Sequence, residues 1–354
     1  MHHVLDDPGF VTRLDPKGIY GLAADFPNQC RRALNIAQAV SLPDLSDRPR
    51  LAVLTGMGGS AAGGDLIRAL FEANGAVPFL VNRDYTLPNC VGLGDLVFCA
   101  SYSGNTEETL SAYDVARKDG ARIVAITSGG ELAAKATADG QGVIEIPGGQ
   151  PPRTALGYMF VPVLVACERF GLLPAQNYAS AFGILDKCLS SWGADVPMAQ
   201  NPAKQIAASI HGKLTMLYGL GSYQAIVANR WKGQINENAK NMAFANGFPE
   251  LNHNEILGWM RASQQGVSFC AGIVLEDGTE SEKMKARARV TEEIIGPSTP
   301  FHHMQALGEN LLERMLSLVY FGDFLSLYLA ALNGVDPENI DSINFLKSEL
   351  TKVD

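Results

Sequence analysis

Apolar and polar positions alternate along the chain in two different rhythms. Short apolar runs such as "LAVLTG" (51–56) and "DLVFCAS" (95–101) end in Gly or Ser and are typical of buried strands. Stretches such as "TEETLSAYDVARKDG" (106–120) have apolar residues at helical spacing, and Gly120 is a typical helix C-terminal residue. Strands that alternate with helices predict βαβ units, so we expect an α/β protein with mainly parallel sheets and helices on both faces.

The second half of the chain repeats this pattern. The segments 50–75 and 213–240 begin about 163 residues apart, and both read as apolar strand, Gly-[Leu/Met]-Gly, serine and helix. Such a repeat predicts two similar α/β halves. Because 174–203 is rich in polar residues and proline, we place the domain boundary there. The predicted parts are an N-terminal helical segment (1–45), a first domain (46–195) and a second domain (196–354), which includes a helix pair within 306–333.

Length and composition agree with a folded two-domain protein. The chain has 354 residues, of which 47% are hydrophobic and 18% charged. A net charge of −9 disfavours nucleic acid and anionic membranes as partners, whereas a small anionic substrate needs only a few local donors. No secretory signal is visible, and charged residues interrupt the longest apolar stretch, 311–332. The six cysteines form no Cys-x-x-Cys pair, so we expect reduced thiols in a cytoplasmic protein.

Open α/β sheets bind ligands at the carboxyl ends of their strands, and three loops qualify. In "GMGGSAAGGD" (56–65), Gly58 and Gly59 allow close backbone approach and Ser60 supplies a hydroxyl. The glycine spacing does not match a dinucleotide fingerprint, and no Gly-Lys-Ser/Thr follows as in a Walker A loop. In "GGQPPRTALGY" (148–158), Arg153 opens an apolar helix; alone, such an arginine is typical of a surface ion pair.

The loop "SYSGNTEET" (101–109) admits two interpretations. Ser101, Ser103 and Thr106 precede a helix that begins near Glu107, and the Thr106–Thr109 spacing is typical of a helix cap. The same density of neutral hydroxyl donors is what a phosphate dianion requires. The residues of this loop leave both interpretations open.

An ordered set of six motifs resembles a known family. The three loops together resemble sugar isomerase (SIS) domains. The segments "RWKGQINENAKNMAFANGFPELNHNE" (230–255), "SLVYFGDFLSLYLAALNGVDP" (317–337) and "INFLKSEL" (343–350) narrow the resemblance to the bifunctional phosphoglucose/phosphomannose isomerases of archaea and bacteria. Each motif alone is weakly specific, and the ordered set spans nearly all of the chain from about residue 50.

The resemblance implies two SIS-type domains and an aldose–ketose isomerase. The substrates would be fructose 6-phosphate and glucose 6-phosphate, with mannose 6-phosphate as a further candidate, interconverted through a cis-enediol. It also implies a homodimer with active sites near the subunit interface, and no metal or organic cofactor. The implied phosphate ligands are Ser60, Ser101, Ser103 and Thr106, with the backbone of Gly58 and Gly59 nearby; the implied catalytic residues are Arg153, Glu237, His253 and Lys347.

The implied roles agree with the chemistry of the side chains. A carboxylate such as Glu237 can carry a proton between two carbons, and Arg153 can stabilise an enediolate as a fixed charge. A histidine titrates near neutrality, which suits His253 for opening the sugar ring, with assistance from Lys347. In the family this histidine reaches the active site of the other subunit. Asp323 lies in an apolar helix, so we expect a buried partner for it.

One segment departs from the family. Many members read "DPTP" where this chain reads "DPEN" (336–339), and the family's threonine is associated with room for the mannose epimer. Glu338 or Ile340 occupies that region here, which puts the mannose activity in question. Two alternatives also stay open: a non-catalytic SIS protein that binds sugar phosphates, and an aminosugar phosphate isomerase. No helix-turn-helix pattern precedes the first half, which disfavours a transcription regulator.

Overall fold

A computed structural model describes residues 3–45, 47–265, 269–296, 299–350 and 352. The chain forms two compact units. The five-stranded unit comprises Asp25–Leu185 and Glu309–Glu313, and the four-stranded unit comprises Met1–Ala24, Asp186–Gly308 and Arg314–Asp354. Each unit is built from two or three separate segments of the chain, whereas the domains predicted from the sequence are each one continuous segment.

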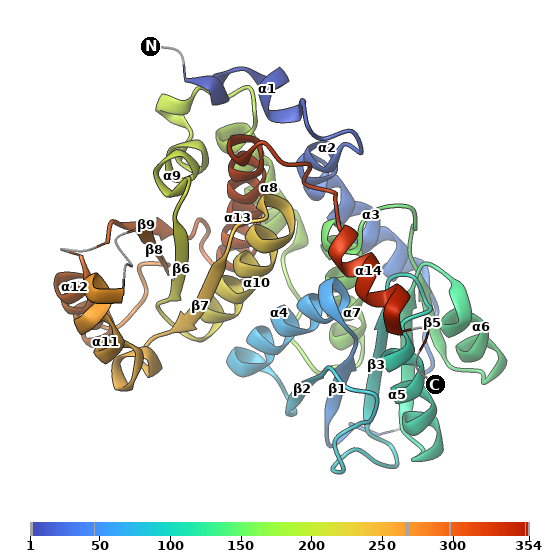
Figure 1. Ribbon diagram of the computed structural model, residues 1–354. Helices are drawn as coiled ribbons and strands as arrows, with labels where there is room; N and C mark the ends of the chain where they lie inside the picture. Colours follow the sequence, from blue (N-terminus) through green and yellow to red (C-terminus); the bar gives the residue numbers. More distant parts are fainter. Residues whose placement is uncertain (1–2, 46, 266–268, 297–298, 351, 353–354) are drawn as a thin grey trace. The chain divides into compact units, whose positions relative to one another are not determined.

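The five-stranded unit contains a parallel sheet in the order β2-β1-β3-β4-β5 (Figure 1). Its elements are α3 (Phe26–Ala39), β1 (Ala52–Thr55), α4 (Gly58–Asn74), β2 (Phe79–Asn82), β3 (Leu96–Ser101), α5 (Glu107–Lys118), β4 (Arg122–Thr127), α6 (Gly130–Ala138), β5 (Gly142–Glu145), η2 (Pro152–Thr154), α7 (Leu156–Arg169) and the first part of α8 (Tyr178–Trp192). Successive strand residues point to opposite faces of the sheet, and helices cover both faces. Val97 and Ile123 face α5 and α6 in one core cluster, and Leu54 packs against Gly64 of α4 on the other face.

The four-stranded unit repeats this order with one strand fewer: β7-β6-β8-β9, again parallel. Its elements are η1 (Val4–Asp6), α1 (Pro8–Thr12), α2 (Ile19–Ala24), η3 (Met198–Gln200), α9 (Pro202–Ile210), β6 (Leu214–Gly219), α10 (Ser222–Ala239), β7 (Ala243–Gly247), η4 (Glu250–His253), α11 (Glu255–Gly258), η5 (Trp259–Gln265), β8 (Cys270–Glu276), α12 (Glu282–Ile295), β9 (Phe301–Gln305), α13 (Leu311–Asn333) and α14 (Asp341–Leu350). The strands β1 and β6, predicted as repeats, occupy equivalent places in the two sheets. The prediction of an α/β fold with parallel sheets and helices on both faces is therefore confirmed.

One long helix replaces the predicted helix pair. α13 is continuous over 23 residues. Gly322 lies in the middle of α13. A Cβ at this position would lie 2.3 Å from the Trp231 ring, so glycine is what permits α10 and α13 to pack closely here. α13 has the length and apolar composition of a membrane span, but 94% of its most apolar stretch is buried in the protein, as in a soluble core helix.

The Gly322–Trp231 contact yields a stability prediction. Gly322→Ala should destabilise the protein by about 1–3 kcal/mol, because the added methyl group overpacks the α10–α13 contact. Gly233→Ala is a matched control: it also lies inside a helix, but its Cβ would meet open space, so we expect a gain of about 0.5–1 kcal/mol. Urea unfolding followed by tryptophan fluorescence measures both changes. Equal stability of the two variants would contradict the account of this contact.

Candidate functional site

The strand order of the five-stranded unit creates a crevice at one edge of the sheet. After β1 the chain moves outward to β2, and after β3 it moves in the opposite direction to β4. Since β1 and β3 are parallel neighbours, with Thr55 paired to Cys99, their carboxyl ends lie side by side at a topological switch point. Ser60 lies in the first turn of α4, shortly after β1, and the hydroxyl loop, residues 101–106, begins at the last residue of β3.

The structure brings the four predicted phosphate ligands together at this edge: Ser60 in the first turn of α4, and Ser101, Ser103 and Thr106 in the hydroxyl loop. The Ser101 and Thr106 hydroxyl oxygens are 2.8 Å apart, and the Gly104 N–H donates to Ser101 Oγ at 3.1 Å. The Ser103 Oγ accepts the N–H of Asn105 at 3.2 Å. The hydroxyl loop contacts the first turn of α4 directly, because the N–H of Tyr102 donates to Ser60 Oγ at 3.2 Å. Their role as phosphate ligands stays a prediction.

The four hydroxyls differ in their access to solvent. Ser101 is fully buried and Ser60 nearly so, whereas Thr106 is half-buried and Ser103 is exposed. A ligand that enters this edge would therefore meet Ser103 and Thr106 first. We expect Ser101 to act behind Thr106, through the hydrogen bond that orients the threonine hydroxyl.

The helices at this edge begin without side-chain caps. Thr106 is the N-cap residue of α5, as its sequence position suggests, but its hydroxyl contacts Ser101 and does not cap the helix. Thr109 has a buried hydroxyl with no hydrogen-bond partner among the described residues, so the predicted Thr106–Thr109 cap interaction is wrong. Met57 precedes α4 and likewise supplies no side-chain cap. The first-turn N–H groups of both helices therefore keep their partial positive charge for a ligand.

Close backbone contacts fix the conformation of the hydroxyl loop. Gly104 has φ +73°, and a Cβ at this position would lie 1.8 Å from the carbonyl oxygen of Gly129. The Gly104 carbonyl accepts the N–H of Leu132 at 2.9 Å, and Asn105 Oδ1 accepts the N–H of Glu131 at 3.0 Å. The loop is therefore held against the loop after β4, so its donors are already ordered before a ligand binds.

Arg153 lies beside the start of α4. It belongs to η2 and is 6% exposed. We call residues 147–157 the Arg153 segment. A Cβ on Gly59 would come within 2.7 Å of the Pro152 carbonyl oxygen, so glycine is what allows α4 to approach this segment so closely. The structure thus places Arg153, Gly59 and Ser60 next to one another.

Two residues that sequence reasoning missed hold the Arg153 segment in place. Gln29 of α3 donates to the Thr154 carbonyl at 2.8 Å and accepts the Gly157 N–H at 2.7 Å. The Tyr102 hydroxyl donates to the Pro147 carbonyl at 3.1 Å and accepts the N–H of Gln150 at 3.3 Å. Tyr102 is recognisable in the sequence as the aromatic residue among the hydroxyls, whereas nothing in the sequence of the 26–39 helix distinguishes Gln29, which is buried.

The other predicted catalytic residues lie on separate elements of the four-stranded unit. Glu237 is in the last turn of α10 and is half-buried. His253 ends η4 and is exposed, and Lys347 is exposed on α14, a helix that buries none of its side chains. The structure describes no contact between His253 and Lys347. The roles of all three stay predictions.

Lys240 is a further residue that sequence reasoning missed. It closes α10 in the left-handed conformation with φ +50°, which is uncommon for a residue other than glycine. Its Nζ donates to the carbonyl oxygens of Glu237 and Asp336, both at 2.7 Å, and of Pro337 at 3.1 Å. Lys240 therefore connects the last turn of α10, which carries Glu237, to the segment 336–339, where this sequence departs from the family pattern.

Asp323 has the buried partner that its position in an apolar helix predicts. Arg230 lies 3.0 Å from its carboxylate, and Gln234 donates to it at 2.6 Å. Burial raises the pKa of Asp323, which the neighbouring Arg230 opposes. The contact joins α10 to α13 and so is structural.

The fold and two domain matches define the class of protein. Residues 45–150 match the SIS domain, and residues 199–350 match the bacterial phospho-glucose isomerase C-terminal SIS domain. A hypothetical protein from Thermus thermophilus has the same fold: its crystal structure superposes with a TM-score of 0.72 at 16% sequence identity and covers 97% of this chain and 93% of its own. The chain is a protein of two SIS domains.

Relatives at higher identity identify the family. A bifunctional phosphoglucose/phosphomannose isomerase from Caldicellulosiruptor bescii is 40% identical over 93% of this chain and 98% of its own length. One from Thermoplasma acidophilum is 36% identical over 84% of this chain and 89% of its own length. This chain belongs to the bifunctional phosphoglucose/phosphomannose isomerase family.

The position of Tyr102 yields a prediction for sugar phosphate binding. Tyr102→Phe removes the hydroxyl that connects the hydroxyl loop to Pro147 and Gln150, just ahead of Arg153. We expect KM for fructose 6-phosphate to rise by up to about tenfold, because a neutral hydrogen bond contributes about 0.5–1.5 kcal/mol. Steady-state kinetics with fructose 6-phosphate measure the change. Tyr113→Phe is the control, because it deletes a tyrosine–aspartate hydrogen bond elsewhere in the same unit. An equal rise in KM for both variants would show that Tyr102 acts only through general stability.

Proposed function

We propose that this protein is an aldose–ketose isomerase that interconverts fructose 6-phosphate with glucose 6-phosphate and mannose 6-phosphate. The observation that carries the proposal is the set of four hydroxyls at the switch point of a SIS domain, in a chain that is 40% identical to a bifunctional isomerase over nearly its whole length. The hydroxyl loop binds the phosphate group of the sugar. Ser103 and Thr106 contact it directly, and Ser60 and Ser101 support them.

Neutral donors suit this task in an acidic protein. The net charge of −9 repels a phosphate dianion at long range, but hydroxyls and first-turn N–H groups bind an anion at short range. Screening limits the repulsion to about 8 Å at physiological ionic strength. Local hydrogen bonds therefore decide whether the phosphate binds.

The chemical step moves a proton between C1 and C2 of the open-chain sugar. Glu237 takes the proton from one carbon and returns it to the other, with an enediol between the two transfers, while a proton passes between the oxygens on C1 and C2 so that carbonyl and hydroxyl exchange places. Arg153 stabilises the negative charge that develops on the enediol oxygen, and it keeps its own charge throughout. His253 and Lys347 move the proton that opens the ring, from the anomeric hydroxyl to the ring oxygen.

We propose that both aldoses are accepted despite the departure at 336–339. The segment forms a turn in which the N–H of Glu338 donates to Asp336 Oδ1 at 2.8 Å, and Lys240 binds the carbonyl oxygens of Asp336 and Pro337. Lys240 thus holds this turn next to the helix end that carries Glu237. Glucose 6-phosphate turnover without any mannose 6-phosphate turnover would remove the second half of this proposal.

We also propose that the protein acts as a homodimer in the cytoplasm. In the four-stranded unit, several large apolar side chains are exposed, as expected for a surface that another copy covers: Met242, Phe244, Leu257, Met260 and Phe269. Five of the six cysteines are buried free thiols and Cys90 is an exposed free thiol, in keeping with a reducing compartment. Light scattering on the purified chain should give twice the monomer mass of 37.9 kDa.

Glu237→Gln is the direct test of the catalytic proposal. Removal of the proton carrier should lower kcat by a factor of about 10²–10⁴ and leave KM for fructose 6-phosphate nearly unchanged, because the amide keeps the shape of the side chain. A coupled assay for glucose 6-phosphate formed from fructose 6-phosphate measures both constants. Wild-type turnover by Glu237→Gln would contradict the assignment.

Two further measurements on the wild-type chain, of fructose 6-phosphate binding and of glucosamine 6-phosphate formation, separate the alternatives. A wild-type chain that binds fructose 6-phosphate tightly and turns over none of it would be a regulatory SIS protein. Formation of glucosamine 6-phosphate in the presence of ammonia would instead favour an aminosugar phosphate isomerase.

A further inference from the structure

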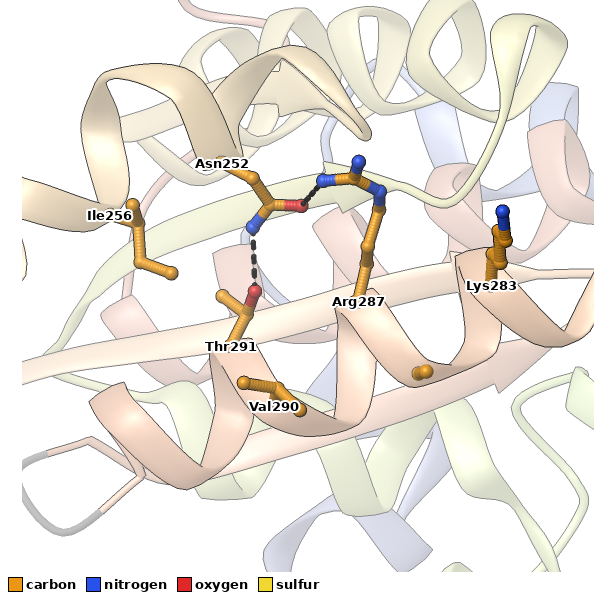
Figure 2. Close-up of a pocket in the computed structure, with 7 residues that line it drawn as sticks. Asn252, Ile256, Lys283, Arg287, Val290 and Thr291 are labelled. Atoms are coloured by element: carbon orange, nitrogen blue, oxygen red, sulfur yellow. Dashed lines mark hydrogen bonds between the residues drawn. The ribbon is translucent and has the colours of Figure 1, made fainter.

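A groove in the four-stranded unit is lined by none of the predicted catalytic residues. It has a volume of about 450 Å³ and lies along α12, opposite η4 and α11. Figure 2 shows two kinds of lining: the basic side chains of Lys283 and Arg287 at one end, and the apolar side chains of Ile256 and Val290 at the other. Thr291 follows Val290 along α12, and Asn252 of η4 contacts both Thr291 and Arg287.

The two basic side chains lack acidic partners. Lys283 and Arg287 are one helical turn apart, a spacing at which like charges destabilise a helix by about 0.2–0.5 kcal/mol. In the described part of the chain, neither has a carboxylate within ion-pair distance. The neighbouring pair on the same helix differs, because Lys285 pairs with Glu282 and Arg289 with Glu293. In a chain with a net charge of −9, an uncompensated pair of cations beside a groove is a specific feature.

The position of Lys283 adds a second cost. It is the second residue of α12, a helix of 14 residues whose N-terminal end carries a partial positive charge. A cation in the first turn of a helix is unfavourable, and an anion beside it is favourable. An anion at this end of the groove would interact with Lys283, Arg287 and the helix end together.

The polar centre of the groove is already ordered. Asn252 Nδ2 donates to Thr291 Oγ1 at 2.8 Å, and Thr291 is buried. This bond directs Asn252 Oδ1 toward Arg287, whose Nη1 approaches it at 3.4 Å (Figure 2). The long contact uses only one of the five guanidinium donors. Arg287 is thus oriented by Asn252 and keeps donors for a ligand.

We propose that this groove binds a small organic anion, with a phosphate or carboxylate group on Lys283 and Arg287 and an apolar part against Val290 and Ile256. The volume is within the range of about 300–1,000 Å³ that small-molecule sites occupy. None of the lining residues has a role in the proposed isomerase reaction, and Asn252 directly precedes His253 in η4.

Calorimetric titration of the full chain with phenyl phosphate tests the site. The titration is run at low salt and without fructose 6-phosphate, because this sugar phosphate would itself compete for the groove. We expect a Kd of about 1 mM or tighter, and a loss of about tenfold or more in the double variant Lys283→Met/Arg287→Met, which corresponds to one strong charge-assisted contact. The control Lys285→Met/Arg289→Met removes the same two charges from the same helix and should change Kd less than about twofold.

Three results would overturn the proposal. They are no binding by the wild-type chain, equal weakening in the two double variants, and inorganic phosphate that binds as tightly as phenyl phosphate. The second would mean general charge attraction, and the third would mean that the apolar end contributes nothing. Benzoate in place of phenyl phosphate distinguishes a carboxylate from a phosphate ligand, and binding of either that depends on Lys283 and Arg287 supports the site.

Discussion

The order of strands in a parallel sheet is the constraint on which the site depends. Because β1 and β3 are neighbours and their chains leave in opposite directions, no connection crosses the edge between them. Two helix N-termini and two loops meet there. Their N–H groups and hydroxyls favour an anion even in a protein of net negative charge. Side-chain caps would have used these donors, and the structure leaves both helices without such caps.

The two units use equivalent edges differently. In the five-stranded unit, glycines at 59 and 104 let backbone segments approach so closely that the hydroxyl loop and the Arg153 segment are fixed in place. In the four-stranded unit the loop after β8 carries Asp277, which accepts the Tyr223 hydroxyl at 2.7 Å and pairs with Arg314 at 3.2 Å. A carboxylate with its own partners repels a phosphate. The loop after β8 therefore differs in charge from the hydroxyl loop of the five-stranded unit.

Much of this organisation is predictable from local pattern. Alternating strands and helices, the repeat 163 residues apart and the hydroxyl-rich loop are all encoded by neighbours in the sequence. The features that sequence reasoning missed depend on distant partners. Thr106 does not cap α5 because its hydroxyl contacts Ser101, and the absence of a Cβ at Gly322 leaves room for Trp231 against the single helix α13. Gln29 and Lys240 likewise act on residues about 100 positions away or more, through bonds that no periodicity reveals.

The central claim is that the hydroxyl loop binds the phosphate of the substrate. A crystal structure of the full chain with fructose 6-phosphate bound tests it most directly. The account predicts phosphate oxygens within about 3.2 Å of the Ser103 and Thr106 hydroxyls, at the N-terminal end of α5. A phosphate bound elsewhere, with these hydroxyls turned away from it, would contradict the account.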